Sequence, residues 1–115
     1  WRAIESAYAN APHFEHYAHD LRFIFKEQHV FLHELNSAIL NWIDNALSLQ
    51  LLIDQSDEFT GQTLSEKKAW LGRALTPTKA YQQVFNGKKE FVQNLSVIDG
   101  LMNEGPLLRN HFVPR

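Results

Sequence analysis

The chain has 115 residues, of which 44% are hydrophobic and 21% charged, and its formal net charge is −2. These values predict one soluble globular domain with a sizeable core, and they exclude the strongly basic composition typical of nucleic-acid-binding domains. The absence of cysteine excludes disulfides, thiolate metal sites and cysteine nucleophiles, and no apolar run approaches the ~18 residues of a membrane span.

The charges are unevenly distributed along the chain. Residues 1–63 hold three basic and nine acidic residues, a net charge of −6, whereas residues 64–115 hold eight basic and four acidic residues, a net charge of +4. This basic excess could bind an anion such as a sugar phosphate or a nucleotide. It could also be a solvated face that complements the acidic half, which is the interpretation we favour. The densest basic residues are Lys67, Lys68, Arg73, Lys79, Lys88 and Lys89.

The first half of the chain predicts three helices. Residues 2–9 form a short helix that ends before Pro12, and Asn10 is expected to cap the helix that follows. Residues 13–28 and 30–49 each carry an apolar stripe at helical spacing, and the second stripe is broad enough to make that helix central. The stripes comprise Phe14, Tyr17, Leu21, Ile24 and Phe25, and then Phe31, Leu35, Ala38, Trp42, Ala46 and Leu49.

The middle of the chain is less regular. The apolar run 51–53 could end the preceding helix or form a short strand, and residues 54–62 are predicted to be a loop. Thr63 and Glu66 fit a capping box, so a helix is predicted over residues 64–75.

The last third combines an irregular segment with two short helices. Residues 81–85 are predicted to be extended or irregular and lead to a turn at Asn86-Gly87, and Ser96 with Asp99 marks a helix start. That helix runs to about Glu104, with Gly105 as its left-handed C-cap residue, Pro106 as its stop, and a last short helix over 107–112. Together the elements predict an all-α fold, a compact bundle of about five helices with one irregular or short extended segment near residues 81–92.

Two stretches of the sequence resemble the WbqC-like protein family. One is SAYANAPHFEHY at residues 6–17, and the other is YQQVF at 81–85, FVQNLSVID at 91–99 and NEGP at 103–106. Gly100 departs from the family pattern, which has a larger apolar residue there. Glycine weakens a helix by about 1 kcal/mol relative to alanine, but it also permits a close approach of the backbone.

The resemblance implies that the chain, residues 1–115, is a single helical domain forming the C-terminal part of a longer protein, a view that fits the missing initiator methionine. Family members often lie among bacterial genes for surface polysaccharide or O-antigen assembly. Aminoacyl or acyl transfer to an amino sugar is a suggested reaction, which implies an amino-sugar or sugar-nucleotide substrate. The start of the chain, residues 1–5, has no signal-peptide architecture, so a cytoplasmic location is expected.

The densest polar cluster lies in the segment that carries the second stretch. Asp99 could act as a general base and Glu104 as a second carboxylate, with the Ser96 hydroxyl on the same helix face as Asp99. The alternative is local structure, in which Ser96 caps the helix and Asp99 interacts with its dipole. Further binding candidates, each of which could instead be an ordinary core or surface residue, are Tyr81, Gln83, Asn94, Asn103, Glu15 and His16.

Other kinds of site receive less support from the sequence. His29 and His33 have a workable metal-ligand spacing, but surface or capping histidines are the default, so no metal is predicted. His16 and Asp20 could pair one helical turn apart. Ser96, His111 and Asp99 lack a nucleophile-elbow pattern, and no phosphate-binding glycine loop is present, so no cofactor is predicted.

Two functions therefore stay open, and a small metal-binding helical protein built on the histidines is a third and less favoured one. One is an enzyme, a transferase of surface-glycan assembly. The other is a non-catalytic binding or scaffold domain that docks a partner through its helical face. In either case the heavy aromatic load predicts self-association, or packing against the absent N-terminal half.

Overall fold

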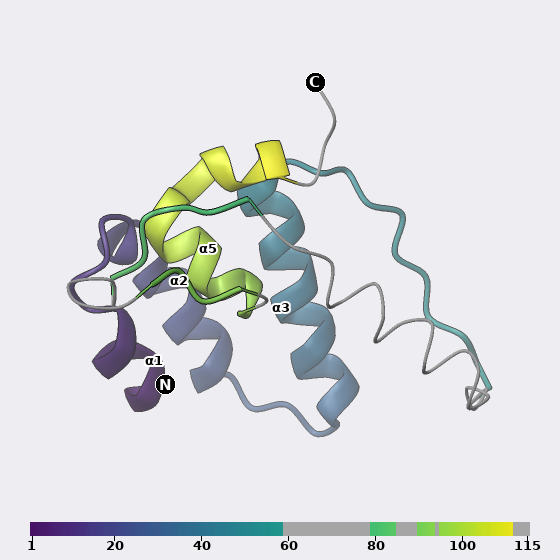
Figure 1. Cartoon of the computed structure of the whole chain (residues 1–115). Coiled ribbons are helices and arrows are strands. Elements are labelled where there is room, and N and C mark those ends of the chain that lie inside the picture. The colour runs from purple at the N-terminus through teal and green to yellow at the C-terminus, as the bar shows by residue number, and fades with distance from the viewer. Residues whose placement is uncertain (59–78, 85–89, 94, 112–115) are drawn as a thin grey trace.

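The computed structural model describes residues 1–58, 79–84, 90–93 and 95–111. This part of the chain is helical, as predicted, and contains no strand (Figure 1). Its elements are α1 (Arg2–Tyr8), α2 (Phe14–Lys26), α3 (Leu32–Leu47), α5 (Val97–Glu104) and the 3₁₀ helix η1 (Gly105–His111). The helix predicted over 64–75 and the turn predicted at 86–87 lie outside the described residues.

The junction between α1 and α2 differs from the prediction. The N-cap position of α2 is occupied by His13, not Asn10, and no side chain caps the helix. Backbone hydrogen bonds replace that cap, because the amide of Ala11 donates to the carbonyl of Tyr8 and the amide of Phe14 donates to the carbonyl of Ala11. The amide of His13, which an Asn10 cap could have bonded, donates instead to the carbonyl of Met102.

The start of α3 is set by Glu34. Its carboxylate accepts hydrogen bonds from the backbone amides of Val30, at 2.9 Å, and Phe31, at 3.2 Å. Both amides precede the helix, so α3 begins at Leu32, two residues after the predicted start. Phe31 is extended and 59% exposed, so its predicted place in the core is wrong.

The residues after α3 leave the helix at Ser48, whose backbone is left-handed at φ 51° and ψ 45°. The apolar run 51–53 then forms neither of the predicted elements and is exposed. The amide of Leu51 donates to the Asp44 carboxylate at 3.0 Å, which ties the chain back to α3.

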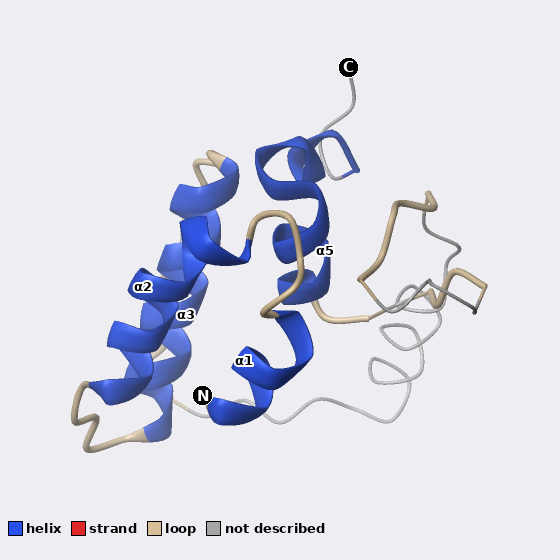
Figure 2. Cartoon of the chain, turned by 90° about the vertical axis from the view of Figure 1, so that its left-hand side faces the viewer, coloured by secondary structure: helices blue, strands red, loops and turns tan. Residues whose placement is uncertain are grey.

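The helices α2 and α3 lie side by side and antiparallel (Figure 2), while α5 packs against α2 and η1 packs against α3. The core forms where these elements meet, and Leu21, Leu47, Leu101 and Met102 have almost no exposed surface. Aromatic contacts extend the core, with Trp1 stacked on Phe14 and Tyr17 edge-on to Trp42. No helix in the described part of the chain is long and apolar enough to cross a membrane.

Two glycines allow the C-terminal elements to pack closely. A Cβ atom on Gly100 would lie 2.6 Å from the Cδ1 atom of Leu108, so this glycine makes room for η1 to fold back on α5. A Cβ atom on Gly105 would lie 2.5 Å from the Nδ1 atom of His13. Gly105 has φ 61° and ψ −140°, so its backbone is not the left-handed helical conformation predicted, although its positive φ still favours glycine.

The segments 79–84 and 90–93 contain no helix or strand, as predicted for the irregular segment. Lys79 is exposed, and the remaining lysines and arginine of the predicted basic group lie outside the described residues.

Candidate functional site

The site is built on the first turn of α5. The Ser96 hydroxyl accepts a hydrogen bond from the backbone amide of Ile98 at 3.2 Å, so Ser96 is the helix cap. Asp99 follows in the first turn, where a carboxylate favours the helix dipole. Its carboxylate does not cap the helix, however, because it points to side chains of the 81–84 segment.

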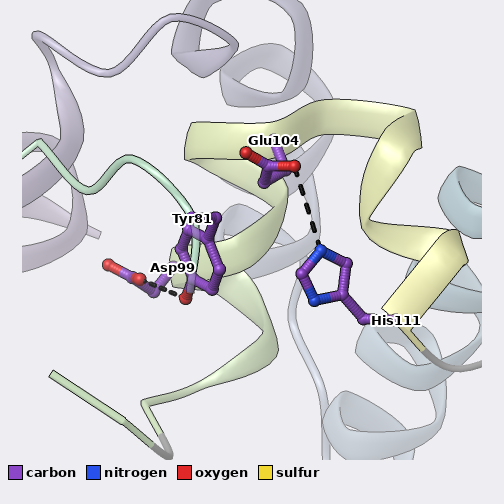
Figure 3. Close-up of polar contacts among 4 residues, drawn as sticks. All are labelled: Tyr81, Asp99, Glu104 and His111. Atoms are coloured by element: carbon purple, nitrogen blue, oxygen red, sulfur yellow. Dashed lines mark hydrogen bonds and ion pairs between the residues drawn. The ribbon is translucent and has the colours of Figure 1, made fainter. Parts of the chain in front are cut away.

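Asp99 is the centre of the candidate site and has no exposed surface. Its Oδ2 atom accepts a short hydrogen bond of 2.6 Å from the hydroxyl of Tyr81 (Figure 3). The side-chain amide of Gln83 donates to the same oxygen at 3.3 Å. A charge-assisted bond to a buried carboxylate is stronger than a neutral one, so these contacts fix the position of Oδ2.

Gln83 is itself buried and held at both ends of its side chain. Its Nε2 atom donates to the carbonyl of Val92 at 2.9 Å, and its Oε1 atom accepts from the amide of Val92 at 3.0 Å. Gln83 thus joins the two extended segments to each other and to Asp99.

The pKa values of two tyrosines, Tyr8 and Tyr81, are raised at the site. The pKa of Tyr8 is raised to about 12, first by burial, then by the negative charge of Asp99 and a hydrogen bond to its carboxylate. Burial, followed by the hydrogen bond to Asp99, also raises the pKa of Tyr81 well above its ordinary value. Both phenols therefore stay protonated at neutral pH, and the Tyr81 hydroxyl donates to Asp99.

Two buried oxygen atoms on α5 lack a hydrogen-bond partner among the described residues. They are the Oδ1 atom of Asp99 and the Oδ1 atom of Asn103. The side-chain amide of Asn103 donates to the backbone carbonyl of Asp99 at 2.8 Å, so the two residues are linked along one helix face. A buried acceptor without a donor is unfavourable by about 1–3 kcal/mol, which makes this pair the most unusual feature of the site.

Glu104 and His111 form a neighbouring pair. The Nε2 atom of His111 lies 3.9 Å from the Oε2 atom of Glu104, and both side chains are partly exposed (Figure 3). The Tyr81 ring contacts the rings of His111 and Phe91 edge-on. Tyr81 therefore separates the buried Asp99 from the more accessible Glu104–His111 pair.

The structure brings together four of the predicted residues, Tyr81, Gln83, Asp99 and Asn103, and places Glu104 at the end of the same helix. The other described candidates make no side-chain hydrogen bond to Asp99: Glu15 and His16 are exposed on α2, and the Ser96 hydroxyl caps the helix while its carbonyl accepts from the Asp99 amide at 2.9 Å. Asn94 lies outside the described residues.

Three other arrangements weighed from the sequence are not found among the described residues. His16 and Asp20 form no ion pair, His29 contacts the carbonyl of Ile24, and His33 stacks on Phe31. In the described part of the chain, no three histidine or acidic side chains come together to hold a metal ion. Ser96, His111 and Asp99 have separate partners and form no relay.

Tyr8 is the participant that sequence reasoning missed. It belongs to the SAY stretch at residues 6–8, which carried the resemblance but contained no obvious site residue. The available sequence signal was the position of Tyr8 at the end of a helix, next to the turn at Pro12. In the structure the backbone amide of His13 in this turn donates to the carbonyl of Met102, which joins the turn to α5.

Comparisons with known proteins identify the family. No curated protein and no solved structure matches the chain significantly. The model of the WbqC-like protein family matches residues 1–76, a range that includes α1, α2 and α3 and ends before Tyr81. Since this match covers more than half of the 115 residues, the chain belongs to the WbqC-like protein family.

Proposed function

We propose that the protein is an enzyme of surface polysaccharide or O-antigen assembly that transfers an aminoacyl or acyl group to an amino sugar in the cytoplasm. Membership of the WbqC-like family supports the setting. The unpartnered carboxylate oxygen of Asp99 supports the chemistry, since it is a buried acceptor with no donor among the described residues.

The missing donor would be the amine of the substrate. Asp99 Oδ1 and Asn103 Oδ1 both accept and cannot donate to each other, so a group with N–H bonds would satisfy both. A phosphate or carboxylate would not, because it brings further acceptors and negative charge next to Asp99.

The reaction follows from that placement. The amine nitrogen attacks the carbonyl carbon of an activated ester or thioester, and the new C–N bond forms as the bond to the leaving oxygen or sulfur breaks. The proton lost by the amine moves to Asp99 Oδ1, which acts as the general base. Tyr81 and Gln83 hold Oδ2, so Oδ1 is the oxygen left free for the proton.

Asp99 has no exposed surface, so the amine can reach it only after the surrounding residues separate. This burial is also what a purely structural role for the cluster would produce. The variants below are chosen to separate the two roles.

The test is mass spectrometry of the surface glycan from a strain that lacks the gene. We expect the glycan to lose an aminoacyl or acyl mass, and the full-length wild-type protein to restore it. Asp99→Asn should fail to restore it, whereas Glu90→Gln, which changes an exposed carboxylate, should succeed. Glycan of unchanged mass in the deletion strain would contradict the proposal.

Because Asp99→Asn could fail for lack of folding, Tyr81→Phe serves as a second variant. It removes the 2.6 Å hydrogen bond to Oδ2 and keeps the ring contacts with Phe91 and His111. We expect a folded protein with reduced glycan modification, and full restoration by Asp99→Asn would remove Asp99 as the base.

A non-catalytic docking domain is the second candidate, and exposed apolar side chains favour it. Phe23 on α2 is 60% exposed, and Val30 and Leu32 at the α2–α3 turn are 82% and 71% exposed. Such residues could contact a second copy or another part of a longer chain. Restoration of the glycan by every Asp99 variant, together with failure of Leu32→Asp, would favour this function.

A further inference from the structure

A groove on the surface of α2 and α3 lies apart from the residues that bond Asp99. It is lined by His16, Tyr17, Asp20, Trp42, Asn45 and Ala46 and has a volume of about 230 Å³. Drug-sized ligands occupy about 300–1,000 Å³, so this groove suits a smaller molecule, about the size of one sugar ring.

The lining has a consistent chemistry. Trp42 supplies an aromatic ring, Asp20 a carboxylate and Asn45 a side-chain amide, and Asp20 and Asn45 are exposed at the groove. No lysine or arginine lines it, and residues 1–63 carry a net charge of −6. This environment disfavours phosphates and carboxylates and favours a cation.

Tyr17 lines the groove next to Trp42. The residue is 4% exposed, and its hydroxyl is buried with no hydrogen-bond partner among the described residues. Its ring packs edge-on against Trp42, with ring centres 5.8 Å apart at an angle of 90°. Because the Tyr17 hydroxyl has no exposed surface, a ligand in the groove meets the Trp42 ring and not this hydroxyl.

We propose that this groove binds a small organic ammonium ion about the size of one sugar ring. The ammonium group pairs with Asp20 and lies against the Trp42 ring, where a cation is attracted to the aromatic face. The exposed Asn45 amide bonds the remaining polar groups of the ligand. This inference does not rest on the proposed function, because binding here needs neither Asp99 nor a transfer reaction.

The test is a nuclear magnetic resonance titration of the whole protein, following the indole N–H signal of Trp42. Assignment of that signal uses Trp42→Phe. The probes are glucosamine and glucose, which match in size and differ by one ammonium group. We expect a saturable shift with glucosamine at millimolar concentration and at least threefold weaker binding of glucose, the size of effect given by a partly exposed ion pair.

Two variants locate the ammonium group. Asp20→Asn should weaken glucosamine binding about threefold and leave glucose binding unchanged. Glu27→Gln is the matched control, because it removes an exposed carboxylate that follows the same helix and does not line the groove. Absence of a saturable shift, equal binding of the two sugars, or an unaffected Asp20→Asn variant would each overturn the proposal.

Discussion

The longer helix α3 buries fewer of its residues than the shorter helix α5. The sixteen residues of α3 include one buried residue, Leu47, whereas α5 has eight residues and buries all five from Asp99 to Asn103. The difference arises because α5 is packed by α2 and η1 and bonded by the 81–84 segment, while much of α3 faces outward. A long apolar stripe therefore does not identify the centre of this protein.

The family match and the candidate site also lie in different parts of the chain. The family match covers α3 and ends at residue 76, whereas the acceptor atoms of Asp99 and Asn103 lie on α5. Tyr8 on α1 connects the two regions through the carboxylate of Asp99.

The largest expected loss of stability comes from a substitution that creates a cavity next to α5. Leu101→Ala removes a side chain with no exposed surface and should lower the free energy of unfolding by about 2–5 kcal/mol. Leu40→Ala on α3, where the leucine is 41% exposed, should lower it by less than about 1 kcal/mol. Urea denaturation of both variants measures the difference. Equal losses that depend on protein concentration would show that another copy covers α3.

A smaller effect is expected at the end of α5. Gly105→Ala places a side chain at φ 61° and ψ −140° and against the ring of His13, so it should lower the free energy of unfolding by roughly 1–3 kcal/mol. Gly100→Ala should be less harmful, since alanine favours the helix by about 1 kcal/mol and the atoms it meets are the end of the Leu108 side chain. Thermal unfolding of the pair checks this order, and a milder Gly105→Ala would contradict the backbone argument.

The smallest expected loss of stability is the one caused by alkaline pH. The pKa of Tyr8 is about 12 in the folded chain, above the ordinary value of about 10 for an unfolded tyrosine. Its contribution to stability is therefore fully present below pH 10 and is lost as the pH rises from about 10 to about 12. We expect the urea midpoint of the wild type to fall more steeply over this range than that of Tyr8→Phe.

Asp99→Asn refines this experiment. It removes the charge of Asp99, so the Tyr8 pKa measured by ultraviolet absorbance should decrease, but it should stay above 10 because burial is the largest cause of the shift. A Tyr8 pKa that did not respond to Asp99→Asn would show that the two side chains do not interact in solution.

Much of the fold could be predicted because local rules decide it. The spacing of Tyr17 and Leu21 placed the buried face of α2, and Ser96 marked the start of α5 through its cap. The errors occurred where backbone and tertiary contacts prevail. Asn10 does not cap α2, because backbone hydrogen bonds take that role. Phe31 is not in the core, because the Glu34 carboxylate accepts hydrogen bonds from the two amides before α3.

The site was predicted in part. The dense polar cluster at 94–104 supplied Asp99 and Asn103 as candidates, and Tyr81 and Gln83 were added because their side chains before that cluster can form hydrogen bonds. The sequence could not show that Asp99 turns away from its own helix cap toward Tyr81, nor that Tyr8 joins it from a distant position in the chain. Such pairings depend on how α1 and α5 meet, which no local pattern contains.

The double hydrogen bond between Gln83 and Val92 has a consequence for the evolution of the chain. The Gln83 side chain imitates a peptide group, so it joins two backbone segments in the way a strand pair would, without extending a sheet edge to other molecules. The two residues are nine apart in the chain, and doubling the length of chain between two joined points adds only about 0.6 kcal/mol of closure entropy. Insertions and deletions between these two residues should therefore be tolerated far better than substitution of the glutamine itself.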